Sequence, residues 1–168
     1  MNPLSLIRQF IRGLTKETEP YQIGLGIAFG TAIGLIPKSN LTAQLLLILL
    51  MATKANLPFA LITIFSVSAL NPLFDRISDP LGYFALSRDS LAPFFTSLYN
   101  MPIAPWTDFN NTVLLGGLIL GLALFFPCYL AGKKFGVYYN AKFKERFTNS
   151  KIVKSMKKSW LLDWYFKE

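Results

Sequence analysis

Two short apolar runs joined by a polar break constrain this chain more than any other feature. Residues 23–36 and 41–52 contain no charged residue, and the break between them, residues 37–40, reads Pro-Lys-Ser-Asn. As helices the runs would be about 21 and 18 Å long, shorter than the ~30 Å hydrocarbon core of a bilayer. Runs this apolar do not suit a protein surface in water. The pattern therefore predicts a broken or re-entrant membrane helix, whose irregular tip must be covered by protein or line a wet cavity.

The composition favours a membrane protein and removes several classes of function. Hydrophobic residues make up 52% of the 168 residues, and the mean hydropathy is +0.40, which is high for a soluble globule. The chain has no histidine and one cysteine, which removes the usual zinc sites and histidine-dependent catalytic sets. No pair of carboxylates lies at a useful spacing inside the apolar region. We therefore expect no enzyme, no metal site and no cofactor.

Positive charge is unevenly distributed along the chain. The net charge is +8, and residues 132–168 hold ten basic and three acidic residues, whereas residues 71–110 hold two basic and four acidic ones. Residues 1–20 are also slightly basic. The positive-inside rule therefore predicts that both termini are cytoplasmic and that the acidic region lies outside. A basic chain can also bind nucleic acid. The apolar runs favour the membrane instead, and we expect no nucleic-acid partner.

Both ends of the chain predict contact with the membrane surface. In residues 1–20, apolar residues recur at helical spacing opposite Arg8, Arg12 and Lys16, which predicts an interfacial amphipathic helix. A helix packed on a soluble partner is the alternative. The tail at residues 132–168 mixes basic and aromatic residues directly after a long apolar run, which favours anionic lipids of the cytoplasmic leaflet. Single-stranded RNA is the competing partner.

Three further segments complete the predicted membrane domain at residues 21–131. Residues 57–86 join a short apolar run to a more charged segment, residues 87–110 are a loop rich in proline and aromatic residues, and residues 113–131 are uncharged. This last run would be about 28 Å long as a helix and is the one full-length span. In the preferred arrangement residues 23–52 dip into the membrane and return. In the alternative they cross it as one kinked helix, and residues 57–86 dip.

Glycines predict where the helices pack. Gly26, Gly30 and Gly34 recur every four residues, a spacing that forms a groove which another backbone can approach closely. Gly117 and Gly121 give the long span a similar face, for which the groove is a candidate partner. The spacing of the first glycines misses a dinucleotide-binding fingerprint by one residue, and no strand pattern precedes it, so we do not expect a nucleotide site.

Polar residues at the breaks are the candidate binding groups. Lys38 supplies a positive charge, and Ser39 or Asn40 can cap the helix that follows. A helix N-terminus beside a lysine attracts anions, which predicts an anion-binding or anion-passing tip. A plain hairpin turn, with Lys38 reaching water at the membrane surface, is the alternative. Three more polar residues are expected to line the site: Gln44, Asn56 and Asn71.

Several of these features occur together in a known family. They are the run Gly24–Pro37, Gln44, the run Lys54–Pro58, the pair Asn71-Pro72 and the sequence Pro80-Leu81-Gly82. With this set the chain resembles the bacterial inner-membrane proteins of domain-of-unknown-function family 2062, over roughly residues 20–135. The resemblance implies an integral membrane protein and no established activity.

We therefore predict an all-α, small integral membrane protein of the cell inner membrane, with broken or re-entrant short helices, one full-length span and amphipathic terminal helices. The expected function is that of a small transporter or lipid-handling protein with an anion-friendly tip. The alternative is a membrane scaffold or accessory subunit, and a soluble fold with an apolar core is a further one. Expected partners are membrane lipids and either a second copy or another membrane protein. Asp75 and Asp79 are assigned to solvent in a structural role.

Overall fold

The computed structural model describes residues 10–11, 13–14, 18–143 and 149, and this part of the chain is helical without any strand. The α-helices are α2 (Pro20–Gly34), α3 (Leu41–Ala52), α4 (Leu57–Ala69), α5 (Asn71–Leu86), α6 (Ala92–Tyr99) and α7 (Thr112–Tyr138). Three shorter turns are η1 (Asp89–Leu91), η2 (Ala104–Thr107) and the π-helical η3 (Tyr139–Phe143). The prediction of an all-α fold is confirmed. The predicted N-terminal helix and most of the basic tail lie outside the described residues.

Two segments differ from their predicted form. The long helix α7 continues to Tyr138 rather than ending at Ala131, because lysine is a good helix former and charges end an apolar face without ending a helix. The segment 87–110, expected to be a loop, contains α6. Pro93 lies in the first turn of α6, where its missing N–H leaves no hydrogen bond unmade.

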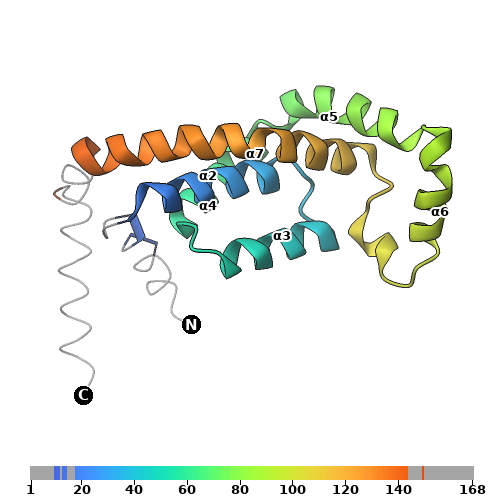
Figure 1. Cartoon of the computed structure of the whole chain (residues 1–168), viewed down its shortest axis with the longest axis horizontal. Coiled ribbons are helices and arrows are strands. Elements are labelled where there is room, and N and C mark those ends of the chain that lie inside the picture. Colours follow the sequence, from blue (N-terminus) through green and yellow to red (C-terminus); the bar gives the residue numbers. More distant parts are fainter. Residues whose placement is uncertain (1–9, 12, 15–17, 144–148, 150–168) are drawn as a thin grey trace, which may run out of the picture.

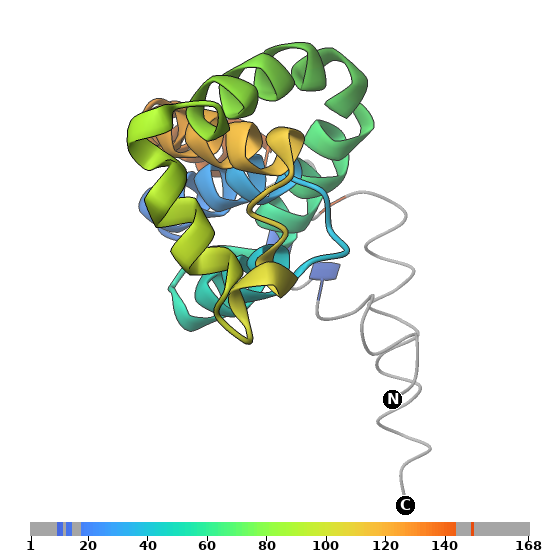
Figure 2. The same cartoon turned by 90° about the vertical axis from the view of Figure 1, so that its right-hand side faces the viewer.

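Helix α2 lies at the centre of the described part. Ten of its fifteen residues are buried, and it packs on α4 along one face and on α7 along another. Figure 1 shows α2 and α7 side by side along the long axis, with α3 below them and α6 across one end. Figure 2, turned by 90°, brings the end with α6 and η2 to the front.

Glycines allow both contacts of α2. The face with Gly26, Gly30 and Gly34 packs on α4, and a Cβ at Gly30 would lie 2.8 Å from the carbonyl oxygen of Ala60. Such a distance leaves no room for any side chain, so the two backbones meet directly. The glycine groove is therefore occupied by α4.

Helix α7 packs on a different face of α2. A Cβ at Gly117 would lie 2.7 Å from the carbonyl oxygen of Leu35, and one at Gly121 would lie 3.1 Å from Cα of Ala32. The glycines of α7 thus contact α2 outside the groove. The sequence made the groove a candidate partner for the α7 glycines, and the structure shows that the two do not pack against each other. The apolar helix α2 is covered from two sides, by α4 in the groove and by α7 on another face.

The chain returns to the start of α2 after α3. The backbone N–H of Asn56 donates to the carbonyl oxygen of Gln22 at 2.9 Å, and its side chain donates to the carbonyl of Gly13 at 3.0 Å. The side-chain oxygen of Asn56 also accepts from the N–H of Phe59, which caps α4. Residues 23–52 are therefore a hairpin and not one kinked helix.

Much of the apolar surface is uncovered. Among the described residues, the helix Thr112–Lys142 is long and apolar enough to cross a membrane, and the pair α4–α5, bent by 78°, would be a second span if it counts as one. Only 22% of the most apolar window of the long helix is buried. Leu122 of α7 is 72% exposed and Phe65 of α4 is 79% exposed. Such surfaces are rare on soluble monomers.

The groove predicts a strong effect of added bulk on stability. Replacing Gly30→Leu forces α2 away from the backbone of α4, and we expect a loss of about 3 kcal/mol in the free energy of unfolding. Replacing Ala123→Leu, at an exposed position of α7, adds a similar volume and is expected to change little. Thermal unfolding of both variants in detergent tests this. Equal midpoints would contradict the close contact between α2 and α4.

The bonds of Asn56 predict a structural role. Replacing Asn56→Ala removes the cap of α4 and the link to Gly13, and we expect a loss of about 1–2 kcal/mol in the free energy of unfolding. The exposed Asn110 provides the control, since Asn110→Ala is expected to be neutral. Thermal unfolding measures both. An unchanged midpoint for the Asn56 variant would show that neither bond contributes.

Candidate functional site

The first break, between α2 and α3, is closed by its own side chains. Pro37 lacks an N–H, which favours an end to α2 before it. The Nζ atom of Lys38 turns back and donates to the carbonyl oxygens of Gly34 at 2.7 Å and of Ile36 at 2.5 Å. Asn40 accepts from the N–H of Ala43 at 2.9 Å and so caps α3. The Lys38 ammonium thus lies at the negative end of α2, where a cation is stabilised.

The second break, between α4 and α5, meets the first at the same place. Ser68 Oγ donates to the carbonyl oxygen of Gly34 at 3.3 Å. With its amide oriented so that the nitrogen faces the nearby carbonyls, Asn71 donates to the oxygens of Gly34 at 3.0 Å and Val67 at 3.1 Å. The chain has bent by 78° at this point. The single carbonyl of Gly34 therefore accepts hydrogen bonds from both breaks.

Two side chains of α5 add polar atoms that the described residues leave without a hydrogen-bond partner. They are Oδ1 of Asp75 and Oγ of Ser78, and both atoms are buried. Ser78 is fully buried, and the negative charge of Asp75 acts on the Lys38 ammonium. Polar atoms buried without partners are costly, so they commonly mark functional positions. We call the set Lys38, Ser68, Asn71, Asp75 and Ser78 the break cluster.

Helix α7 packs on the first break and on α5 through a pair of adjacent glycines. A Cβ on Gly117 would crowd the carbonyl of Leu35 at the first break, and a Cβ on Gly116 would overlap the carbonyl of Ser78 on α5. One apolar helix therefore supports the polar cluster from the side. Among the described residues no group of three or more His, Cys, Asp or Glu side chains is placed to hold a metal ion.

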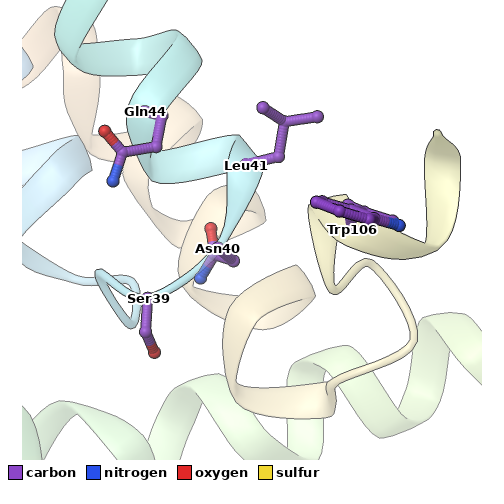
Figure 3. Close-up of a pocket in the computed structure, with 5 residues that line it drawn as sticks. All are labelled: Ser39, Asn40, Leu41, Gln44 and Trp106. Carbon is purple, nitrogen blue, oxygen red and sulfur yellow. The ribbon is translucent and has the colours of Figure 1, made fainter.

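A groove of about 550 Å³ lies beside the first break. It is lined by Ser39, Asn40, Leu41, Gln44 and Trp106. Figure 3 shows Leu41 and Trp106 on opposite sides of the groove, and Ser39 pointing from the break away from them. The Thr42 hydroxyl donates to the carbonyl of Thr107 at 2.7 Å, which fixes η2 against α3.

The structure divides the predicted site residues into three places. Lys38 and Asn71 come together on the Gly34 carbonyl, although they are far apart in sequence. The residues Ser39, Asn40 and Gln44 line the adjacent groove. Asn56 lies at the opposite end of α2, where it caps α4, so the structure does not bring it to the others.

Sequence reasoning missed three members of the break cluster: Ser68, Asp75 and Ser78. Assigning Asp75 to solvent was wrong for one of its oxygens, because the bend at Leu70 turns α5 so that Oδ1 is buried. Asp79 is exposed and accepts a hydrogen bond from the Thr112 hydroxyl. The available signal was the spacing of Asn71, Asp75 and Ser78, which places them on one face of a helix.

Comparisons with known proteins identify the family of the chain. A family described as "Uncharacterized protein conserved in bacteria (DUF2062)" matches residues 6–144. An "Uncharacterized protein" of Treponema pallidum (strain Nichols) is 30% identical over 118 residues, which are 70% of this chain and 73% of the relative. No solved structure matches. The match confirms the resemblance inferred from the sequence: the chain belongs to domain-of-unknown-function family 2062, which is conserved in bacteria.

Proposed function

We propose that this protein is a multi-pass protein of the bacterial inner membrane that handles an anionic solute or lipid at the break cluster. The observation that carries the proposal is the Gly34 carbonyl, which accepts from Lys38 in one break and from Ser68 and Asn71 in the other. Interrupted helices that meet inside a membrane are the usual setting of transport sites. Ionisable groups at such depth commonly act on a substrate.

The uncovered apolar surface supports the membrane placement. A core helix of a soluble protein would be mostly buried, whereas the long helix is mostly exposed along its most apolar window. Helices α2 and α3, with 15 and 12 residues, are each shorter than a bilayer core. They would enter from the cytoplasmic side and return to it, with α4 and α7 passing beside them. Both termini would then be cytoplasmic.

Lys38 is the residue to which we assign the anion. Two of its three N–H donors are used by carbonyl oxygens, and the third has no partner among the described residues. The groove lined by Ser39 and Gln44 lies beside the same break and would supply polar contacts. A lysine fixed by its own helix end loses little freedom on binding, which favours affinity.

A membrane scaffold is the second candidate function. It is favoured by α3, whose exposed apolar residues leave one side of a short helix uncovered. Helix packing carries function in that case, and the Lys38 charge does not. The two candidates therefore differ in how they respond to loss of Lys38.

The proposed topology predicts opposite labelling of two positions. In a Cys128→Ser background, Ser97→Cys on α6 is expected to react with a membrane-impermeant maleimide in intact spheroplasts, because α6 would lie outside. Lys54→Cys, between α3 and α4, is expected to react only after the membrane is opened. Both positions are exposed in the fold. Labelling of Lys54→Cys in sealed spheroplasts would contradict a returning hairpin.

The assignment of Lys38 predicts a loss of anion affinity. Replacing Lys38→Ala removes a charged donor worth about 1.5–3 kcal/mol, so binding of phosphatidylglycerol is expected to weaken by about tenfold or more. Lys54→Ala, which removes an exposed lysine at the other end of α2, is the matched control. Native mass spectrometry with titrated lipid measures both. Equal affinities in both variants and the wild type would exclude Lys38 and favour the scaffold.

A further inference from the structure

The break cluster holds one positive and one negative charge. The negative charge of Asp75 acts on the Lys38 ammonium, and in the helices packed around the two residues the segments 20–34, 57–69 and 113–131 are uncharged. Two other charged residues lie on α5 itself: Arg76 is exposed, and Asp79 is exposed and bonded to Thr112. A site with this balance suits a ligand that itself carries both signs of charge.

The unsatisfied atoms specify what the positive end of that ligand must be. When the Asp75 carboxyl is ionised, its Oδ1 accepts hydrogen bonds and cannot donate one. The Ser78 Oγ can also accept a hydrogen bond. The two residues are three apart on α5 and share a helix face. A primary ammonium carries three donors and can meet both oxygens. A quaternary ammonium carries none.

The position of the cluster along α7 points to a lipid as the source. A Cβ on Gly116 would contact Ser78 and one on Gly117 would contact Leu35, so Ser78 and the first break lie about 6–8 Å along α7 from its start at Thr112. The helix Thr112–Lys142 is about 46 Å long, more than the ~30 Å hydrocarbon core. Its ends therefore extend into the headgroup regions, and the cluster lies near the outer one.

We propose that the break cluster binds a zwitterionic phospholipid headgroup with a primary ammonium, of the ethanolamine class. The phosphate accepts from the remaining N–H of Lys38. The ammonium donates to Asp75 Oδ1 and Ser78 Oγ, which are buried in this fold, so binding requires the groups that cover them to move. This inference rests on the proposed function and adds the group that recognises the cationic half of the ligand. Asp75 and Ser78 then act as specificity residues, because a choline headgroup leaves both oxygens without a donor.

The test compares three lipids that share the same acyl chains. Purified full-length protein is titrated with phosphatidylethanolamine, phosphatidylcholine and phosphatidylglycerol and followed by native mass spectrometry. The wild type is expected to bind the ethanolamine lipid about tenfold or more tightly than the choline lipid. Asp75→Asn is expected to remove this preference. Asp79→Asn is the matched control: it removes the same charge one turn away, where Thr112 already satisfies the carboxylate, and is expected to keep the preference.

A second variant guards against a folding defect. Ser78→Ala removes one of the two acceptors without changing charge, and it is expected to reduce the preference in part while the thermal midpoint stays at or above that of the wild type. Soluble phosphoethanolamine forms a further arm. It is expected to displace the ethanolamine lipid from the wild type at millimolar concentration and to fail to do so from the Asp75→Asn variant; equal displacement from both proteins would count against the site.

The failures of the two proposals can be told apart. Equal affinity of the wild type for the ethanolamine and choline lipids would overturn this inference. If phosphatidylglycerol binding still depended on Lys38, the proposed function would stand. A preference that survives both Asp75→Asn and Ser78→Ala would likewise overturn it. If none of the three lipids bound, this inference would be overturned, and so would the proposal that the protein handles a lipid.

Discussion

The carbonyl oxygen of Gly34 is the point on which the rest of the structure depends. Gly34 is the last residue of α2, and its oxygen accepts hydrogen bonds from Lys38 in the first break and from Ser68 and Asn71 in the second. This convergence requires α2 and α4 to touch along their backbones, which the glycine groove permits. The spacing of three glycines therefore determines where two distant polar breaks meet.

The sequence predicted the local features of this arrangement well. Apolar runs and prolines locate the breaks, and Asn40 and Asn56 have the residue type and position of helix caps, which they are in the structure. The resemblance to a known family also came from short local patterns. Each of these signals depends on residues that are neighbours in the chain, so each can be recognised without knowledge of the fold.

The sequence could not predict which polar residues would be shared between the breaks. Asn56 and Asn71 look alike as residues at helix starts, yet Asn56 lies beside the start of α2 and Asn71 lies at the break cluster. Asp75 looked like a surface carboxylate because Arg76 and Asp79 are next to it. Only the 78° bend after α4 decides which side of α5 is buried, and a bend angle is set by packing against α7.

Lys38 connects the stability of the fold to its proposed function. Its ammonium stabilises the carbonyl end of α2, and the negative charge of Asp75 acts on that ammonium. An anion that drew Lys38 away from Gly34 and Ile36 would leave those carbonyls with fewer donors and would loosen the contact between the two breaks. Ligand binding and the joining of α2 to α4 would then be linked equilibria, in which each alters the other by the same free energy. A ligand that uses only the third donor of Lys38 avoids this cost, which favours a small headgroup beside the break over a larger anion within it.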